Sequence, residues 1–461
     1  MAAAGLTRLI MKKTVVIDIV GLSAAVIGTH TPFLQAYIAG KTLRHIQPML
    51  PAVTTAVQST YVTGKWPAEH GIVGNGWYDK DDCEVKFWKQ SNKLVQAEKM
   101  WERAKKEDPA FTCATMFWWY NMYTAADYSV TPRPNYLADG RKMPDCYSHP
   151  AELRDELQAK FGQFPLFQFW GPGANIKSTE WIANASIYTD EKYNPTLTFI
   201  YLPHLDYCLQ KFGPALDTIQ KELGEIDNEV KKLVTYYESR NAEVILLSEY
   251  GIAPVSKPIH INRVLREKGL LQIRIERGLE LLDPGASKAF AVADHQVAHI
   301  YINDPSVEGE VLQLVNGLKG VTLVLDKAGK AQHHIDHERA GDIVLMADKD
   351  SWFTYYFWLN DAVAPDYARA VDIHKKPGYD PVEMFMTSKA RAGYKLLRKK
   401  AGLRYVMDVI PLDATLIKGS HGSLAVDRDY YAVLITKDGA NDVGDIQAVD
   451  VYDVIWGHLN G

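Results

Sequence analysis

The stretch LPAVTTAVQSTYVTGKWPAEHGIVGNGWYD, residues 50–79, sets four threonines and a serine ahead of a turn-rich segment. Threonine and serine side chains disfavour an ordinary surface helix. Pro51 can nevertheless start a helix, and Thr54 or Thr55 then lies at its N-terminus, where free N–H groups and the helix dipole favour anionic ligands. The residues alone therefore predict a nucleophile or an anion contact at one of these two threonines.

Around this stretch, apolar runs predict buried strands over residues 14–20, 198–203, 242–251, 299–304, 321–326 and 341–348. Amphipathic helical patterns alternate with them, for example over residues 151–162 and 214–241. This alternation predicts an α/β fold with a mostly parallel central sheet and helices on both faces. Ligands of such sheets bind beyond the carboxyl ends of the strands, so we expect the site near the polar segments HLDY, SEYG and GSHGS.

The length of 461 residues allows one large domain with ample core. Because the chain shows no internal repeat, no low-complexity tract and no clear linker, we expect a single domain over residues 1–461. An inserted cap subdomain is expected over residues 265–340.

The composition excludes several classes of protein. Hydrophobic residues make up 47% and charged residues 23%, and the net charge is −5, which indicates neither disorder nor a basic nucleic-acid surface. We expect a small phosphorylated metabolite or nucleotide as partner, with no nucleic acid and no membrane, while the oligomeric state stays open. Four scattered cysteines and the absence of a signal-peptide pattern predict a cytoplasmic protein with reduced thiols.

The order of these elements resembles the alkaline phosphatase superfamily, in its nucleotide pyrophosphatase/phosphodiesterase and phosphonoacetate hydrolase branch. That branch has a threonine nucleophile about nine residues before Thr-Gly, followed by a proline and His-Gly-Ile. Here Thr54 precedes Thr63-Gly64 by that interval, and Pro67 and the segment HGI at residues 70–72 follow. The resemblance runs from residue 12 to about residue 427 and implies an alkaline-phosphatase-like sheet with inserted cap segments.

The resemblance also implies divalent metal ligands after separate strands. The family segment with a metal-binding Asp and a His four residues later matches YLPHLDYCLQKFGP, and the family Ser-Asp-His-Gly matches SEYG. The late Gly-x-His-Gly matches GSHG. The implied metal positions are Asp206, Gln210, Glu249, Tyr250 and His421, with Asp18 on the first strand.

Several of these positions depart from the family pattern. Val20, Gln210 and Tyr250 stand where the family has Asp, His and His, and Asp18 lies two residues before the expected position. Zinc is the metal implied by the family, while an oxygen-rich site suits Mg²⁺, Mn²⁺ or Ca²⁺, with one ion or two. Asp372 and His374, on a loop shortly before His421, are expected as substitute ligands.

The implied chemistry is attack by Thr54 on phosphorus, followed by hydrolysis of the phosphothreonine. Gln58, one turn further along the predicted helix, is expected to hold a nonbridging oxygen, and Thr55 is the alternative nucleophile. Asn75, Trp77 and Tyr78 are expected to line the substrate pocket. His295 and His299, by contrast, are expected to be packed in the core.

Two functions follow from these expectations. The first is a metal-dependent hydrolase of phosphodiester, pyrophosphate or phosphomonoester bonds in a small metabolite or nucleotide, with a threonine nucleophile. The second is a catalytically weakened family member that binds a phosphorylated ligand or a protein partner. The retained threonine favours the first function, and the departures at the metal positions favour the second.

Overall fold

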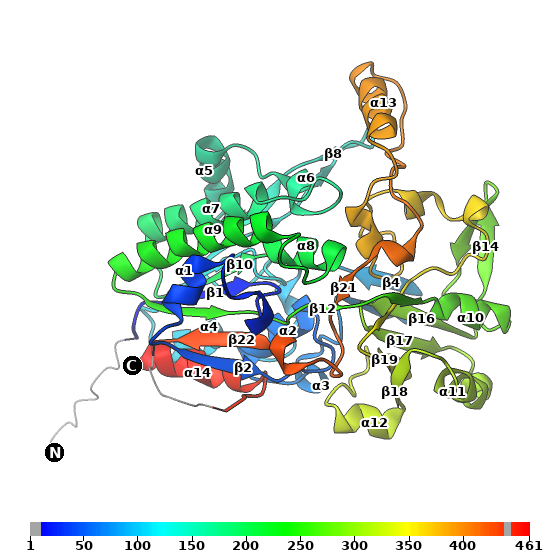
Figure 1. Ribbon diagram of the computed structural model, residues 1–461, viewed down its shortest axis with the longest axis horizontal. Coiled ribbons are helices and arrows are strands. Elements are labelled where there is room, and N and C mark those ends of the chain that lie inside the picture. The colour runs from blue at the N-terminus through cyan, green and yellow to red at the C-terminus, as the bar shows by residue number, and fades with distance from the viewer. Residues whose placement is uncertain (1–10, 438–443) are drawn as a thin grey trace.

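The computed structural model describes residues 11–437 and 444–461 (Figure 1). Its main sheet has eight strands in the order β2-β22-β11-β1-β10-β5-β6-β9. The inner strands β11, β1, β10, β5 and β6 run parallel, whereas β2, β22 and β9 at the two ends pair antiparallel. The strand bounds are Thr42–Ile46 (β2), Ala432–Thr436 (β22), Glu243–Leu247 (β11), Thr14–Ile19 (β1), Leu197–Leu202 (β10), Cys113–Met116 (β5), Tyr128–Pro132 (β6) and Cys146–His149 (β9).

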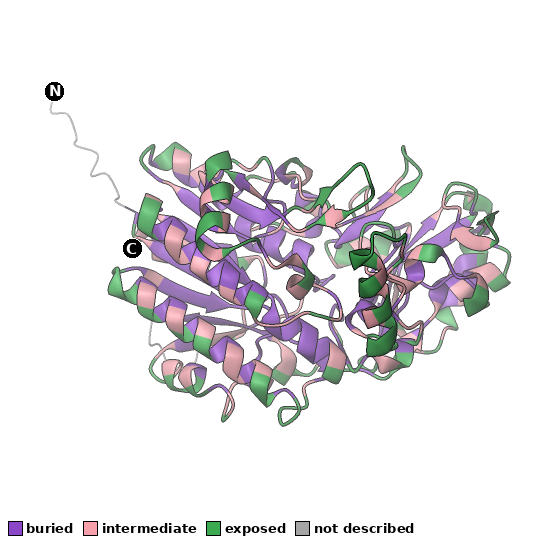
Figure 2. Ribbon diagram, turned by 90° about the horizontal axis from the view of Figure 1, so that it is seen from above, coloured by how far each residue is buried: buried purple, intermediate pink, exposed green. Residues whose placement is uncertain are grey.

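Helices cover both faces of this sheet, as Figures 1 and 2 show. Helices α7 (Lys177–Tyr193), α8 (His204–Phe212) and α9 (Gln220–Ser239) lie on one face, and α2 (Thr54–Thr63) and α14 (Asp450–Asn460) lie on the other. The alternation of side chains along β1 serves both layers, because Val15 and Ile17 join the core on the α9 side while Val16 joins the core on the α2 side. The prediction of a mostly parallel sheet with helices on both faces is confirmed.

A second, antiparallel sheet lies beside the first in the order β16-β17-β19-β18. Its strands are Ala289–Asp294 (β16), Val297–Ile302 (β17), Ile343–Ala347 (β19) and Val321–Leu325 (β18), and helices α10 (Ile261–Glu267), α11 (Glu308–Asn316) and α12 (Lys327–Gln332) pack around it. Three of the six predicted strands therefore belong to this sheet and not to the parallel one. The division that places an inserted subdomain at residues 265–340 stays a prediction.

Shorter elements complete the fold. They are α1 (Pro32–Tyr37), α3 (Pro67–His70), β3 (Gly76–Asp79), β4 (Glu84–Phe87), α4 (Met100–Glu107), β7 (Asn135–Tyr136), β8 (Lys142–Met143), α5 (Ala151–Phe161), α6 (Leu166–Phe169), β12 (Ala253–Pro254), β13 (Lys257–Ile259), β14 (Ile273–Glu276), β15 (Leu279–Leu282), β20 (Ser351–Phe353), α13 (Lys389–Lys400) and β21 (Gly419–Ser420). Among the described residues, no helix has the length and apolar character needed to cross a membrane. The N-terminal end, where we expect no signal peptide, begins with residues outside the described part.

Candidate active site

Helix α2 carries the predicted nucleophile at its first residue. The helix begins at Thr54, after Val53 in extended conformation, so it starts three residues beyond Pro51 and not at that proline as predicted. The hydroxyl oxygen of Thr54 lies 2.9 Å from the hydroxyl of Tyr250, which follows strand β11. The carboxyl end of β11 thus meets the N-terminal end of α2, where the predicted site lies.

The neighbouring threonine is held by the backbone instead. The hydroxyl of Thr55 donates to the carbonyl oxygen of Gly74 at 2.8 Å, and its N–H donates to Oδ1 of Asn75 at 3.1 Å. These bonds tie the first turn of α2 to the loop before β3. The structure therefore brings Thr54 to the titratable groups and leaves Thr55 as an anchor of the helix.

Gln58 lies between two buried carboxyl groups. Its Nε2 donates to Oε1 of Glu249 at 2.6 Å and lies 3.5 Å from Oδ2 of Asp18. The backbone N–H of Trp119 donates to Oε1 of Gln58 at 2.7 Å. Because a backbone N–H can only donate, this bond fixes the orientation of the amide and directs its NH₂ group at Glu249.

The two carboxyl groups perturb each other. Burial, and then the charge of Glu249, raises the pKa of Asp18 well above its usual value. Burial also raises the pKa of Glu249, although hydrogen bonds from neighbouring groups, Asp18, Gln58 and Thr54 among them, oppose the rise. Oδ1 of Asp18 and Oε2 of Glu249 are buried without a hydrogen-bond partner among the described residues, so burial favours the protonated form of these carboxyl groups.

A third carboxyl group, Asp206 on α8, has its own amide partner. Nε2 of Gln210 donates to Oδ2 of Asp206 at 2.9 Å, and the Tyr250 hydroxyl donates to Oδ1 at 3.3 Å. Because Tyr250 gives its proton to Asp206, Thr54 supplies the proton of the bond between the two hydroxyls. Burial raises the pKa of Asp206 to about 7, against the hydrogen bond from Gln210.

His421 lies beside Asp206, but the Tyr250 ring covers it. The two rings stack with centroids 3.5 Å apart and an interplanar angle of 6°. Nδ1 of His421 donates to the carbonyl oxygen of Ala52 at 2.8 Å, so its Nε2 carries the lone pair, 3.9 Å from Oδ1 of Asp206. Burial, and then the neighbouring His295, lowers the pKa of His421 well below its usual value.

A glycine brings the segment of His421 to α8. A Cβ atom at Gly419 would come within 2.2 Å of the carbonyl oxygen of Leu209, so only glycine allows strand β21 to lie against this helix. The N–H of Lys418 then donates to the carbonyl oxygen of Gln210 at 3.0 Å. This close approach sets His421 next to the carboxyl group of Asp206.

The turn between β16 and β17 adds Asp294 and His295 to the site, and Tyr379, which the sequence analysis did not single out, lies against them. His295, expected in the core, forms the turn between β16 and β17, where its ring lies 3.8 Å from that of His421 and 3.6 Å from that of Tyr379. Its Nδ1 lies 2.7 Å from Oδ1 of Asp294, which also accepts the side-chain amide of Asn75 at 3.1 Å. The polar turn ADHQ between two apolar strands is the signal that identifies this contribution.

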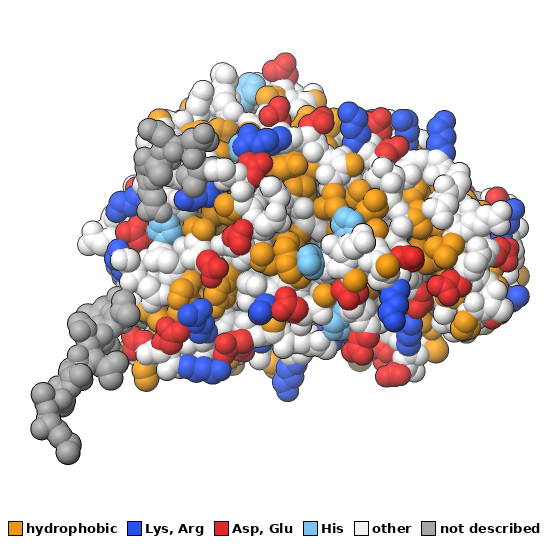
Figure 3. Space-filling view, turned by 90° about the horizontal axis from the view of Figure 1, so that it is seen from below, with side chains coloured by type: hydrophobic (Ala, Val, Ile, Leu, Met, Phe, Trp, Pro, Cys, Tyr) orange, Lys and Arg blue, Asp and Glu red, His pale blue; other side chains and the backbone are white. Residues whose placement is uncertain are grey.

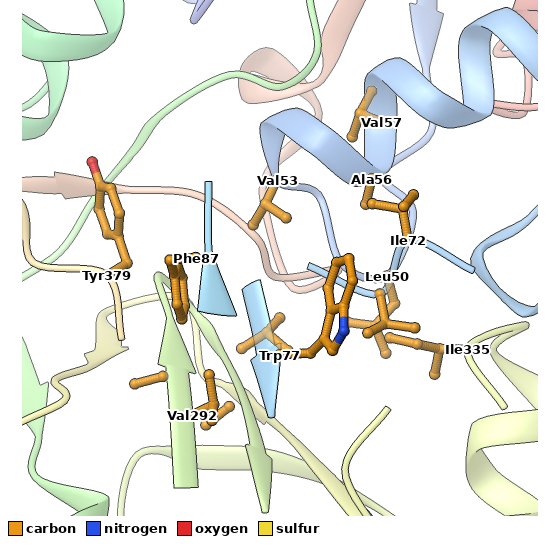
Figure 4. Packing of buried hydrophobic residues seen from close by; sticks show 14 of the residues in the cluster. Leu50, Val53, Ala56, Val57, Ile72, Trp77, Phe87, Val292, Ile335 and Tyr379 are labelled. Carbon is orange, nitrogen blue, oxygen red and sulfur yellow. The ribbon is translucent and has the colours of Figure 1, made fainter. Parts of the chain in front are cut away.

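Other predicted residues lie away from these carboxyl groups. Trp77 packs in the core with Leu50 and Ile335, as Figure 4 shows, and the ring of Tyr78 meets Phe290 edge to face at 4.9 Å. We predicted that Trp77 and Tyr78 line a substrate pocket. In the structure both rings are instead buried among core side chains.

The loop with Asp372 and His374 also makes its contacts elsewhere. The N–H of Asp372 donates to Glu383 at 2.9 Å, and Nδ1 of His374 lies 3.4 Å from the carbonyl oxygen of Phe87. Partial desolvation, and then the charges of Lys142 and Lys89, lowers the pKa of His374, although much of its side chain is exposed. A histidine close to lysines is a weak ligand for a cation, because the lysine charges repel the ion. The contacts of this loop also join it to Glu383 and Phe87, and not to Asp206 or His421.

An aromatic wall flanks the site, formed by Trp88, Trp119, Trp170 and Tyr379. The rings of Trp88 and Trp119 lie 4.8 Å apart, and those of Trp170 and Tyr379 lie 5.8 Å apart. This wall is bonded to the site at two points, because Trp119 donates to Gln58 as described and the Tyr379 hydroxyl donates to Oε1 of Gln210 at 3.0 Å. The three tryptophans are half-buried.

Backbone strain occurs at Trp88 of this wall and on both sides of Trp119, in the segment 117–123. Trp88, Phe117, Tyr120 and Tyr123 all have positive φ, between 54° and 64°. Bulky residues rarely adopt this conformation, and such strain clusters at ligand-binding sites. The surrounding structure therefore holds the wall in a conformation that its local sequence disfavours.

The fold and these residues define an α/β protein of the alkaline phosphatase superfamily. The chain belongs to the type I phosphodiesterase/nucleotide pyrophosphatase family, whose model matches residues 14–380. An uncharacterized pyrophosphatase/phosphodiesterase of Schizosaccharomyces pombe is 25% identical over 245 residues, which cover 51% of this chain and 41% of the yeast protein. This chain therefore spans well under half the length of that relative.

Solved structures share the fold at low identity. Murine ectonucleotide pyrophosphatase/phosphodiesterase 5, in an inactive form in complex with AMP, matches with a TM-score of 0.59 and 14% identity over 97% of this chain and 95% of its own. Phosphonoacetate hydrolase from Sinorhizobium meliloti 1021, in complex with phosphonoacetate, matches with a TM-score of 0.62 and 14% identity over 98% and 96%. Both matches support the eight-stranded fold.

The residues of this site do not fit the two-metal centre that the family implies. The amide groups of Gln58 and Gln210 and the hydroxyl of Tyr250 direct hydrogens at Glu249 and Asp206, in the space that a cation would share with these oxygens. Within residues 11–437 and 444–461, no three His, Cys, Asp or Glu side chains lie together as metal ligands. A hydrogen-bonded network thus stands where the family pattern has ligands.

Proposed function

We propose that this protein binds a phosphorylated small molecule of the nucleotide class at the N-terminus of α2, with little or no hydrolysis. One observation carries the proposal: the Tyr250 hydroxyl lies between Thr54 and Asp206, and its ring covers His421. The nucleophile is therefore kept in place while the groups that would activate it through metal ions bond to one another. This is the weakened family member anticipated from the altered positions.

The surroundings of Thr54 support binding of an anion. Helix α2 is ten residues long, and its first N–H groups and dipole favour a phosphate at that end. The backbone N–H of Trp88 donates to the carbonyl oxygen of Asn75 at 2.9 Å, which joins the aromatic wall to the loop that anchors α2. We assign Asn75 to the substrate side of the site, as expected from the sequence.

The aromatic wall supports a ligand with a flat ring. Half-buried tryptophans offer faces on which a nucleobase stacks. The indole N–H of Trp119 is buried and finds no acceptor within the described part of the chain. Lys89 and Lys142 lie near the same wall, around His374. The AMP complex of the murine relative provides a ligand of matching chemistry.

The space behind Tyr250 is too small for this ligand. A cavity of about 20 Å³ lies between Glu249, Tyr250 and His421 and admits one water molecule at most. We therefore expect a nucleotide to approach from the side of the aromatic wall, where Gln58 and Gln210 are bonded to Trp119 and Tyr379.

The second candidate is hydrolysis of a phosphodiester, pyrophosphate or phosphomonoester bond by Thr54. The order of hydrogen bonds favours it, because the Thr54 proton points at Tyr250 and the Tyr250 proton points at Asp206. In this reaction Oγ1 of Thr54 bonds to phosphorus while the leaving group departs, and water then cleaves the phosphothreonine. In the family, divalent ions activate this nucleophile. No step through such ions follows from the residues present here.

Calorimetry with AMP, inorganic phosphate and pyrophosphate, in EDTA and then with Zn²⁺, Mg²⁺, Mn²⁺ or Ca²⁺, tests the two candidates. We expect AMP to bind in EDTA, and Trp119→Ala to weaken it about tenfold through loss of a stacking face. Trp456→Ala, which removes a half-buried tryptophan on α14, is the control. Failure of all three ligands to bind under every condition would refute the binding proposal.

A turnover assay on phosphodiester, pyrophosphate and phosphomonoester substrates completes the test. Hydrolysis that disappears in Thr54→Ala while AMP still binds establishes the second candidate. Hydrolysis that survives in Thr54→Ala but not in Thr55→Ala reverses the choice of nucleophile. Binding without turnover under every metal condition establishes the first candidate.

A further inference from the structure

A hairpin at residues 386–408 projects from the body of the protein and consists mainly of helix α13 (Figure 1). None of the twelve residues of this helix is buried, and seen from above, in Figure 2, its ribbon shows exposed and intermediate residues only. The base of the hairpin is closed where the N–H of Thr387 donates to the carbonyl oxygen of Val409 at 2.8 Å. The hairpin is therefore a projection whose helix is largely open to solvent, with Ala392 as the apolar residue of α13 that packs against the core.

The charged side of α13 faces the hairpin itself. Lys395 forms an ion pair with Asp408 at 2.7 Å, and Arg391 pairs with the same carboxylate. The Arg398 guanidinium donates to the carbonyl oxygen of Arg404 at 2.8 Å. These bonds tie the helix to the returning chain through its basic side chains.

The apolar side of α13 faces solvent. Leu397 is 66% exposed and Tyr394 is 55% exposed, and the returning chain adds Leu403 at 55% and Val406 at 57%. Helices on soluble proteins normally turn their apolar stripe to the core and their charges to water. Here the arrangement is reversed, so several large apolar side chains remain in water together, which is unfavourable without a partner.

The rim of this apolar side is basic. Residues 386–408 contain seven lysines and arginines against the single acid Asp408, although the whole chain carries a net charge of −5. Lys389, Lys399 and Lys400 are all exposed. An exposed apolar stripe bordered by lysines is the pattern of helices that lie in the interface of an anionic membrane.

We propose that the hairpin at residues 386–408 docks this protein on an anionic lipid surface, with Tyr394, Leu397, Leu403 and Val406 entering the acyl boundary. From the composition we expect no membrane partner, but surface docking needs no helix that spans the bilayer. The hairpin lies on the side of the molecule that Figure 2 faces. On the opposite face, shown in Figure 3, cations and anions are interspersed.

Two other occupants fit this surface less well. A nucleic acid offers its phosphates to the lysines but no apolar partner to leucine and valine side chains. A second copy placed by a two-fold axis would bring two hairpins with the same charge together. An anionic bilayer matches both the charge and the apolar side chains.

Sedimentation with lipid vesicles tests the proposal on the full chain. The protein should co-sediment with vesicles of phosphatidylglycerol and phosphatidylcholine. A smaller fraction should co-sediment with vesicles of phosphatidylcholine alone, and 0.5 M salt should weaken binding to the anionic vesicles. Leu397→Ser with Leu403→Ser should lower binding about tenfold through loss of buried apolar area. Ile275→Ser, which changes a side chain of similar exposure on β14, is the matched control and should leave binding unchanged.

A second pair of variants tests the charges. Lys399→Glu with Lys400→Glu should lower binding at least tenfold, because each cation near an anionic surface contributes several-fold to binding. Lys349→Glu, at an exposed position outside the hairpin, is the control. Equal binding to both kinds of vesicle, no binding to either, or a concentration-dependent dimer that the leucine variants abolish would overturn the proposal, the last in favour of a second copy.

Discussion

The two halves of the candidate site differ in how closely they keep the family pattern. The helix half, formed by Thr54, Thr55 and Asn75, follows the motif and is held by bonds to backbone groups. The carboxyl half, formed by Asp206, Glu249 and their partners, has lost that pattern and is held by bonds between side chains. The difference shows that the first turn of α2, with the predicted nucleophile Thr54, is anchored mainly through Thr55, while Thr54 itself reaches the carboxyl half through its bond to Tyr250.

The largest expected effect comes from restoring the family pattern in the carboxyl half. Val20→Asp with Tyr250→His replaces an apolar group and a covering ring by two metal ligands, so Zn²⁺ should bind and raise the melting temperature. Wild-type protein should show no such rise. Elemental analysis measures the bound zinc, and thermal unfolding with and without Zn²⁺ measures the change in melting temperature. A zinc-dependent rise in the wild type as large as that in the variant would contradict the loss of the centre.

Gln58→Leu should destabilise the protein by about 3 kcal/mol, because Glu249 loses a donor and the backbone N–H of Trp119 loses its acceptor. Urea unfolding measures the change. Gln90→Leu is the control, since this amide also has one donor and one acceptor partner but is half-buried. Equal losses of unfolding free energy in Gln58→Leu and Gln90→Leu would show that the buried carboxyl half contributes no more to stability than an ordinary half-buried amide.

His70 on α3, whose ring contacts Thr60 of α2, predicts a dependence of stability on pH. Burial lowers the pKa of His70, which accepts the N–H of Ile72 through Nδ1, to about 3. The neutral ring is therefore favoured in the folded state, and its contribution is full above the unfolded pKa of about 6.5 and is lost as pH falls toward 3. Between pH 6.5 and pH 5, wild type should lose about 2 kcal/mol relative to His70→Gln. If the curves of unfolding free energy against pH for the wild type and His70→Gln ran parallel, the lowered pKa of His70 would be contradicted.

Tyr250→Phe should cost about 1–2 kcal/mol, because Thr54 and Asp206 each lose one hydrogen bond. Tyr61→Phe, which removes a single bond to the carbonyl oxygen of Ser248, is the matched buried control. Denaturant unfolding of both variants gives the comparison. A stabilised Tyr250 variant would mean that the hydroxyl strains the site.

The smallest effect is expected at the loop that was predicted to complete the metal centre. His374→Ala should change stability by less than about 0.5 kcal/mol, as for other exposed positions. Metal content, measured by elemental analysis, should stay the same as in the wild type. A loss of bound metal in this variant alone would restore His374 as a ligand.

The sequence predicted the elements better than their assembly. The pattern around Thr54 predicted a helix there, with its start at Pro51 three residues too early, because helix signals are local. It could not show that residues 299–304, 321–326 and 341–348 form a separate antiparallel sheet, since an apolar run does not identify its partner strand.

The site was predicted where its residues follow strands of the main sheet. Asp206 and Glu249 follow β10 and β11 of the main sheet, whereas His421 follows β21 of a two-stranded sheet, and His295 and Tyr379 come from the second sheet and a loop without regular structure. Their positions depend on tertiary packing, for which spacing along the chain gives no signal. The amide partners show the same limit, because nothing in the sequence reveals that Trp119 orients Gln58.

The position of β22 in the main sheet bears on how the chain matures. Strand β2 forms its ladder with β22, which comes from the last tenth of the sequence and also pairs with β11. At ordinary rates of synthesis, the β2 segment waits on the order of tens of seconds for this partner to leave the ribosome. During that interval an unpaired strand edge is open to other chains, so nascent protein should depend on chaperones until β22 enters the gap.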